Sequence, residues 1–193
     1  LIVNGGFETG DFSGWTATPA SQGSGFYVAS EAGIPSRPNQ GPTPFYIPHS
    51  GTYVAVMGAF DVGFFDSISQ TVATTPGQPY VIDFWLFNGT VVSATPSSEF
   101  KASWGGNVLL DQANPPVLLY PSPSYPAYTE YTFVETPTTA STTLQFSAYE
   151  TTGYFLLDDV SVSAVPEPST LTLLGIGAFC FWGFAWRRRK QAA

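Results

Sequence analysis

The sequence predicts an all-β protein that carries a short apolar segment at its C-terminal end. Between residues 1 and 164, short runs of β-branched and aromatic residues are separated by Gly, Pro, Ser and Asn, and no amphipathic helical pattern is visible. Several short strands at regular spacing are typical of a β-sandwich, and their number fits a jelly roll. We therefore expect a jelly-roll β-sandwich over residues 1–164 and a C-terminal single transmembrane helix within residues 165–193.

The expected strands are the segments in which β-branched and aromatic residues are concentrated. They are Tyr53–Met57, Ser67–Ala73, Tyr80–Asn88, Glu99–Trp104, Val108–Leu110, Glu130–Glu135, Thr142–Tyr149 and Tyr154–Ala164. Residues 81–87 are apolar on both faces apart from Asp83, which predicts an interior strand. Gly105 and Gly106 supply the positive φ that a hairpin turn after Trp104 requires.

Two proline-rich stretches are expected to be loops. Ser30–Pro48 and Gln112–Tyr128 each contain five prolines, and this density excludes a central strand. Both stretches are long enough to carry a binding site, although plain irregular connections explain them equally well.

Aromatic side chains are the candidates for ligand contacts, because sugar rings stack on exposed Trp and Tyr side chains. Trp15 and Trp85 are expected in the core, since the first follows a tight turn and the second lies in the predicted interior strand. The candidate ligand contacts are Trp104 at a hairpin edge and the loop tyrosines Tyr120, Tyr125 and Tyr128.

The charge of the chain is divided unevenly. Residues 1–169 contain all fourteen acidic residues but only two basic ones, Arg37 and Lys101, which gives a net charge of −12. Such a body repels phosphate backbones, so nucleic acid is excluded as a partner. Divalent cations and neutral polymers are better candidates, and a solvated acidic surface that maintains solubility is the alternative.

Two further observations concern export. The chain opens on Leu1 without an initiator Met, which indicates that a signal peptide was removed or is left out of this sequence. The single cysteine, Cys180, excludes an intrachain disulfide.

The C-terminal tail combines an apolar run with a basic end. Seventeen residues, Thr170–Trp186, carry no charge, and Arg187–Lys190 follow at once. A helix of this length spans about 25 Å, near the short limit for a bilayer core. A buried core helix is the alternative, but core helices rarely end in three arginines. The positive-inside rule places the basic end in the cytoplasm and the β domain outside it.

The apolar run is preceded by Val165, Pro166, Glu167, Pro168 and Ser169. It is followed by Arg187, Arg188, Arg189 and Lys190. The three parts in this order resemble the PEP-CTERM sorting signal of Gram-negative bacteria. The resemblance implies an inner-membrane-anchored precursor whose tail is processed by an exosortase. It also implies delivery to the cell surface or to extracellular polysaccharide, and it carries no information on activity.

The two ends of the body resemble carbohydrate-binding-module-like jelly rolls. Residues 4–15 are similar to their opening strand and turn, and residues 156–162 are similar to their closing strand. The resemblance implies that the first and last strands lie close together, often joined by a structural calcium ion.

The closing strand also suggests a metal site on physical grounds. Regular alternation would place Asp158 on one face with Leu156, Val160 and Val162, where an unpaired carboxylate is costly to bury. A calcium ion bound by oxygen ligands would satisfy both Glu8 and Asp158. The second-rank metal ligands are Asp11 and Asp159. In the alternative interpretation Glu8 caps a turn and Asp158 accepts backbone N–H bonds at the rim of the sandwich.

The sequence offers no convincing catalytic constellation. His49 is the only histidine and lies in a proline-rich loop, so a zinc site with several His or Cys ligands is excluded. The Gly-Gly pairs lack the features of a phosphate-binding loop. We therefore expect an exported, non-catalytic protein of the cell surface or exopolysaccharide. The alternatives are a glycan-binding module that recognises a defined polysaccharide and a small polysaccharide-active enzyme.

Overall fold

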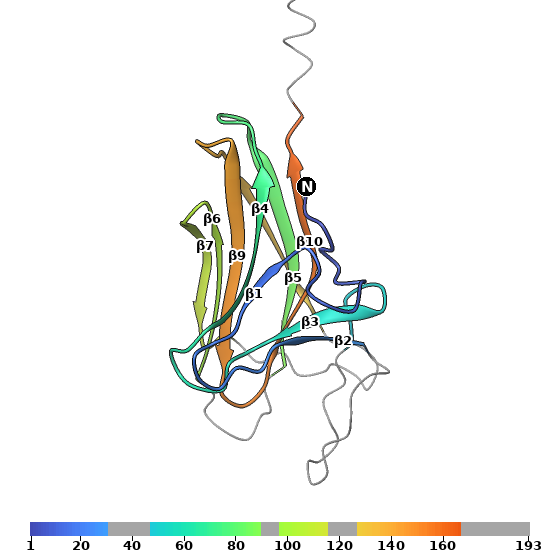
Figure 1. Ribbon diagram of the computed structural model, residues 1–193, viewed down its shortest axis with the longest axis vertical. Coiled ribbons are helices and arrows are strands. Elements are labelled where there is room, and N and C mark those ends of the chain that lie inside the picture. Colours follow the sequence, from blue (N-terminus) through green and yellow to red (C-terminus); the bar gives the residue numbers. More distant parts are fainter. Residues whose placement is uncertain (31–46, 90–96, 116–126, 167–193) are drawn as a thin grey trace, which may run out of the picture.

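The computed structural model describes residues 1–30, 47–89, 97–115 and 127–166. These residues form two five-stranded antiparallel sheets packed face to face (Figure 1). The all-β prediction is therefore confirmed. Within the described ranges, no helix is long and apolar enough to cross a membrane. The predicted transmembrane segment, residues 170–186, lies outside them.

Each sheet mixes strands from distant parts of the chain. The order is β1-β4-β9-β6-β7 in the first sheet (sheet A) and β2-β3-β10-β5-β8 in the second (sheet B). The strands are β1 (Thr16–Thr18), β2 (Tyr27–Ser30), β3 (Tyr53–Met57), β4 (Asp66–Ala73), β5 (Tyr80–Asn88), β6 (Ser98–Trp104), β7 (Asn107–Ala113), β8 (Thr129–Glu135), β9 (Ser141–Glu150) and β10 (Phe155–Ala164). From β3 onward every connection except the β6–β7 hairpin crosses between the sheets, as in a jelly roll.

All eight predicted strands are present, and β3 and β5 have the predicted bounds. The predicted hairpin turn is also confirmed, with φ of 57° at Gly105 and 86° at Gly106. β7 is longer than predicted because Asp111 and Ala113 continue to pair with β6. β1 and β2 were not predicted, because both are short edge strands and β1 exposes all three of its side chains.

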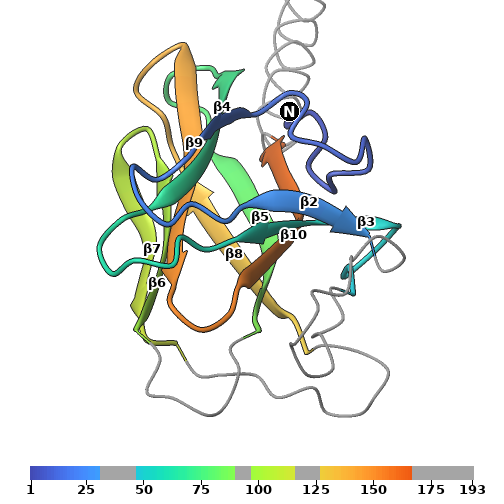
Figure 2. The same cartoon turned by 60° about the horizontal axis from the view of Figure 1, so that its bottom comes forward.

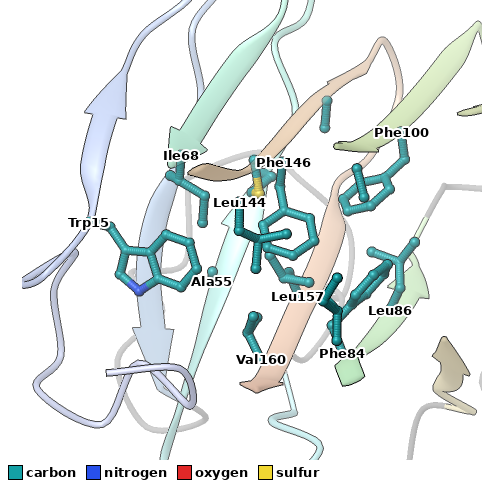
Figure 3. Close-up of a cluster of buried hydrophobic side chains, with 14 of the residues drawn as sticks. Trp15, Ala55, Ile68, Phe84, Leu86, Phe100, Leu144, Phe146, Leu157 and Val160 are labelled. Atoms are coloured by element: carbon teal, nitrogen blue, oxygen red, sulfur yellow. The ribbon is translucent and has the colours of Figure 1, made fainter. Parts of the chain in front are cut away.

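The core lies between the sheets and is dominated by large aromatic and aliphatic side chains. Figure 3 shows Ile68, Leu144, Phe146 and Phe100 of sheet A facing Ala55, Phe84, Leu86, Leu157 and Val160 of sheet B. Trp15 closes one side of this cluster and stacks on Phe7 at a centroid distance of 5.8 Å. The prediction that Trp15 belongs to the core is confirmed.

The closing strand β10 departs from regular alternation. Its pairing with β5 shifts between Asp158 and Ser161, and Asp159 has a φ of 48°. Because of this bulge, Val160 and Val162 face the core, whereas Leu156 packs in a separate cluster. The predicted face containing Leu156, Asp158, Val160 and Val162 is therefore wrong, because a bulge reverses which residues point inward.

The two ends of the sandwich differ. The chain leaves the sandwich after β10, at an end that also holds the start of the chain (Figure 1). There the Leu1 nitrogen donates to the Val162 carbonyl at 2.6 Å, and Val165 is hydrogen-bonded to Gln78 and Pro79. We call residues 1–5, 71–80, 134–142 and 160–166 the exit end. The connection between β3 and β4 lies at the opposite end, which we call the far end.

Candidate functional site

The buried carboxylate of Asp158 holds residues 49 and 50 against sheet B. Its side chain is fully buried. Asp158 Oδ2 accepts the backbone N–H groups of His49 at 2.8 Å and Ser50 at 3.2 Å, and Oδ1 accepts that of Asp159 at 2.8 Å. The carboxylate thus satisfies three backbone donors from two segments that are distant in sequence.

Glu8 makes an equivalent contact at the start of β3. Its Oε1 accepts the backbone N–H groups of Thr52 at 2.9 Å and Tyr53 at 3.0 Å. Gly51, with a φ of 65°, allows the chain to turn beside this carboxylate. The hydrogen bonds at Glu8 and Asp158 are those of the alternative interpretation, a cap and a rim acceptor. We call Glu8, Asp158 and Asp159, with the segment 49–53 that they hold, the acidic clasp.

The Asp158 and Asp159 carboxylates and the aliphatic part of Glu8 lie beside Gly6. A methyl group placed on Gly6 would lie 3.5 Å from Asp159 Oδ1, 3.9 Å from Asp158 Oδ1 and 3.8 Å from Glu8 Cγ. Among the described residues, no three His, Cys, Asp or Glu side chains are arranged to hold a metal ion. A cation at this position would therefore need backbone carbonyl oxygens in addition to the carboxylates, which is a donor set that suits calcium.

The environment of Asp158 raises its pKa to about 7. Burial is the main cause, because removal from water disfavours the charged form, and the nearby charge of Asp159 adds to it. The N–H bonds from Ser50, Asp159 and His49 oppose the rise but do not cancel it. The clasp is thus a place where an ionised carboxylate is costly unless a cation joins it.

Asp11, a second-rank metal ligand in the prediction, belongs to a separate turn. Its Oδ1 accepts Thr9 Oγ1 at 2.8 Å and the Ser13 backbone N–H at 2.9 Å. Hydrogen bonds from Ser13 and then Thr9 hold the pKa of this carboxyl below its usual range. The structure uses Asp11 to close the opening turn, whereas Asp159 lies with Glu8 and Asp158.

An aromatic cluster adjoins the clasp on the outer face of sheet B. The His49 ring stacks on Trp85 at a centroid distance of 3.8 Å, and Tyr128 meets His49 edge-on at 5.3 Å. The Tyr128 hydroxyl donates to the Ile47 carbonyl at 2.9 Å. Trp85 is half-buried on this outer face and not in the core, which corrects the prediction, because Phe84 occupies the inward position beside it.

The other predicted ligand contacts have different outcomes. Tyr128 is half-buried in the cluster just described, and Tyr120 and Tyr125 lie outside the described residues. Trp104 is only 2% exposed, so the prediction of an exposed contact there is wrong. It is the last residue of β6 and points inward before the turn at Gly105 begins.

The clasp does not have the geometry of a nucleophilic catalytic site. Ser50 Oγ donates to Asp159 Oδ1 at 2.7 Å, and His49 Nδ1 lies 2.7 Å from Asp159 Oδ2. Both side chains therefore bind the same carboxylate. In a catalytic triad, by contrast, the serine hydroxyl would bind the histidine.

A second aromatic cluster lies at the far end of the sandwich. Phe60, Val62 and Phe64 are 38%, 59% and 36% exposed, and Tyr27 beside them is 39% exposed. Tyr154 joins this group, with its ring centroid 5.6 Å from that of Phe60 and 6.2 Å from that of Tyr27. We call these five residues the far-end patch. Large apolar groups gathered on a surface often mark an interaction site.

The far-end patch is built on a braced scaffold. Buried Asp66, at the start of β4, accepts the backbone N–H groups of Ala20 and Gly25 at 2.8 and 3.1 Å. The Phe60 N–H donates to the Gly23 carbonyl at 2.7 Å. Figure 2 shows the β1–β2 and β3–β4 connections side by side. A methyl group on Gly25 would lie 2.6 Å from the Phe60 ring, so the glycine permits this close packing.

Sequence reasoning missed the contribution of His49 to the acidic clasp, and it missed the far-end patch. His49 was expected only as a residue of a proline-rich loop, although the clasp uses its backbone N–H and its ring. The far-end patch has a visible signal, the run Phe60-Asp61-Val62-Gly63-Phe64-Phe65, in which large apolar residues are interrupted by Asp and Gly. Such a run outside a strand predicts exposed apolar side chains.

Comparison with known proteins identifies the tail. Residues 164–190 match the family model described as the PEP-CTERM protein-sorting motif. This match confirms the predicted sorting tail and indicates an exported, membrane-anchored precursor. A comparison with curated protein sequences gave no match.

Solved structures identify the fold of the body. TmCBM61, solved with β-1,4-galactotriose, matches with a TM-score of 0.54 and 19% identity over 84% of this chain and 96% of its own. The K1 cleaved adhesin domain of Lys-gingipain from Porphyromonas gingivalis W83 matches with a TM-score of 0.54 and 17% identity. This match covers 83% of this chain and 96% of the adhesin domain. The enzymatically active domain of bacteriophage CBA120 tailspike protein 4 matches with a TM-score of 0.53 and 16% identity over 85% of this chain. The present chain spans only about a fifth (21%) of the tailspike chain. The described body thus has the β-sandwich fold of these proteins.

Proposed function

We propose that this chain is an exported, non-catalytic protein that associates with extracellular polysaccharide through its far-end patch. An exosortase would process its tail, and the sandwich would lie outside the cytoplasm. The observation that carries the proposal is the exposure of Tyr27, Phe60, Val62 and Phe64 together, at the end opposite to the exit of the chain.

The chemistry of the far-end patch suits a neutral glycan. Apolar faces of sugar rings pack on exposed aromatic rings, and sugar hydroxyl groups need polar partners at the rim. Here Gln22 and Asp61 are exposed beside the aromatic side chains. Lys101, the one basic residue in the described ranges, lies on β6 and is bonded to Glu99 at 2.6 Å. Lys101 Nζ also lies 4.8 Å from the centroid of the Phe65 ring, next to the patch, and its ion pair with Glu99 offsets the positive charge that an anionic polymer would need.

Two comparisons support this proposal without extending to ligand identity. The sorting tail directs the protein out of the cytoplasm, and extracellular polysaccharide is available outside. The fold is that of TmCBM61, which was solved with a galactotriose. The geometry around His49 and Ser50 gives no support to a nucleophilic enzyme.

The test is binding of the full chain, reconstituted in lipid nanodiscs, to exopolysaccharide from its own host. We expect saturable binding, and we expect F60A together with F64A to weaken it about tenfold, because loss of aromatic stacking costs about 1–2 kcal/mol. Val108→Ala is the matched control, because Val108 is 67% exposed on β7, outside the patch. Absence of binding by the folded wild-type chain would contradict the proposal.

We further propose that a calcium ion binds at the acidic clasp and has a structural role. Glu8, Asp158 and backbone carbonyl oxygens would hold it, with Asp159 nearby and Asp11 left to its turn. The supporting observation is that the Asp158 and Asp159 carboxylates lie together beside Gly6, with the Glu8 side chain next to them, and that Asp158 is fully buried.

Calcium should therefore raise the melting temperature of the full chain, and chelator should reverse the change. A ligand at a hundred times its Kd stabilises a protein by about 2.7 kcal/mol. Asp158→Ala should abolish the response, whereas Asp83→Ala, an acid of sheet B outside the clasp, should retain it. An unchanged melt of the wild-type chain with calcium or chelator would remove the proposal.

A further inference from the structure

The exit end of the sandwich is almost free of charge, although the protein as a whole is strongly acidic. Within its four segments, residues 1–5, 71–80, 134–142 and 160–166, Glu135 is the only acidic or basic side chain. The segments that connect strands here, residues 74–79 and 136–140, consist of Thr, Pro, Gly, Gln and Ala. The other acidic side chains of the described body belong to the clasp, the opening turn, the strands and the far end. Of these, Asp11 of the opening turn lies beside this end, because Asn4 Nδ2 donates to its carbonyl oxygen at 3.0 Å.

The exit end also exposes apolar side chains. Val3 is 62% exposed and Val134 is 62% exposed, and Leu1 beside Val162 is 59% exposed. Val3 is fixed to the sandwich by its backbone, because its N–H donates to Gln70 Oε1 at 2.8 Å and its carbonyl accepts Gln70 Nε2 at 3.0 Å. Its side chain is thus presented to the surroundings from a rigid position.

The described chain stays hydrogen-bonded to this surface as far as Val165. The Val165 N–H donates to the Pro79 carbonyl at 2.9 Å, and Gln78 Nε2 donates to the Val165 carbonyl at 2.6 Å. The uncharged run begins at Thr170, five residues later. Even a fully extended chain covers only about 17 Å over five residues. Glu167 of the sorting motif is the only charged residue in this interval.

From these observations we propose that, in the membrane-anchored precursor, the exit end rests on the lipid surface. This inference depends on the membrane anchorage stated above and adds the face that contacts the bilayer. A surface with one acidic side chain avoids repulsion from anionic headgroups, and Val3 can enter the boundary between headgroups and acyl chains. The far-end patch then points away from the membrane.

The test uses the full chain with Cys180→Ala, reconstituted in vesicles that contain anionic phosphatidylglycerol. A single cysteine replaces Val3, or Val62 as the control, which is equally exposed (59%) but lies at the far end. Each cysteine carries an environment-sensitive fluorophore. We expect a blue-shifted emission and quenching by lipids spin-labelled near the headgroup for Val3→Cys, and neither effect for Val62→Cys.

The possible outcomes separate the inference from its premise. A chain that floats with the vesicles but shows equal, unquenched fluorescence at both positions overturns the lipid contact and leaves anchorage intact. A chain that does not float overturns both. Protection of position 3 that occurs only when an exosortase is co-reconstituted overturns the lipid assignment in favour of a protein contact.

Discussion

At the scale of single residues, Asp158 shows how one buried acid can organise two distant segments. Its two oxygens accept three backbone N–H groups, so replacement by an apolar residue would leave several buried donors without partners. The same burial makes its charge costly, which raises its pKa to about 7. Asp158 therefore supports the fold by its hydrogen bonds and opposes it by its charge.

This conflict predicts a pH dependence in the absence of calcium. Between the unfolded value near 3.8 and the folded value of about 7, the folded state binds a proton at Asp158 that the unfolded state lacks. The contribution of this bound proton to the unfolding free energy is complete below pH 4 and is lost as the pH rises through 7. Relative to Asp158→Asn, the wild-type chain in chelator should lose about 2–4 kcal/mol of unfolding free energy over this range.

The measurement is chemical denaturation of both proteins at several pH values. Asp111→Asn, on an exposed part of β7, serves as the control and should retain the wild-type slope. With saturating calcium the slope should disappear from the wild-type chain, because a bound cation keeps the carboxylate ionised. Identical slopes for wild type and Asp158→Asn in chelator would show that Asp158 does not titrate in this range.

At the scale of elements, the sequence predicted strands well where alternation is regular and burial is strong. β5 was predicted with its observed bounds because residues 81–87 form an apolar run interrupted only by Asp83, with Pro79 and Gly89 on either side of the strand. β1 could not be found, because its three exposed residues pair with β4 through backbone bonds that any sequence can make. Edge strands of this kind carry no hydrophobic signal.

The candidate site was predicted only in part, for a related reason. The acidic residues of the clasp could be named from their positions at the two ends of the body. The bulge at Asp159 could not be predicted, because a positive φ at an Asp residue depends on tertiary contacts. Here the contact is the close approach of Gly5 to Val160. The same limit applies to Trp104 and Trp85, whose inward or outward direction is set by the register of β6 and β5.

At the scale of the whole molecule, the charge and exposed apolar area of the surface change from one end of the sandwich to the other. The exit end is nearly uncharged, the acidic clasp lies on sheet B, and the exposed aromatic patch lies at the far end. A tail that anchors one end leaves the other end directed outward. In the proposed arrangement, the fold directs the far-end patch away from the membrane.

The sorting motif also predicts the fate of the tail. If an exosortase acts at the sorting motif, protein recovered from the cell surface or exopolysaccharide should end before Arg187–Lys190, whereas the inner-membrane fraction should retain them. Mass spectrometry of the C-terminal peptide from each fraction measures this directly. Pro166→Ala with Pro168→Ala should shift the protein to the full-length, membrane-bound form, because the processing enzyme would no longer recognise the motif. Full-length chain in the exopolysaccharide of a host with an active exosortase would show that surface delivery proceeds without cleavage, and the orientation of the far-end patch would then persist in the mature protein.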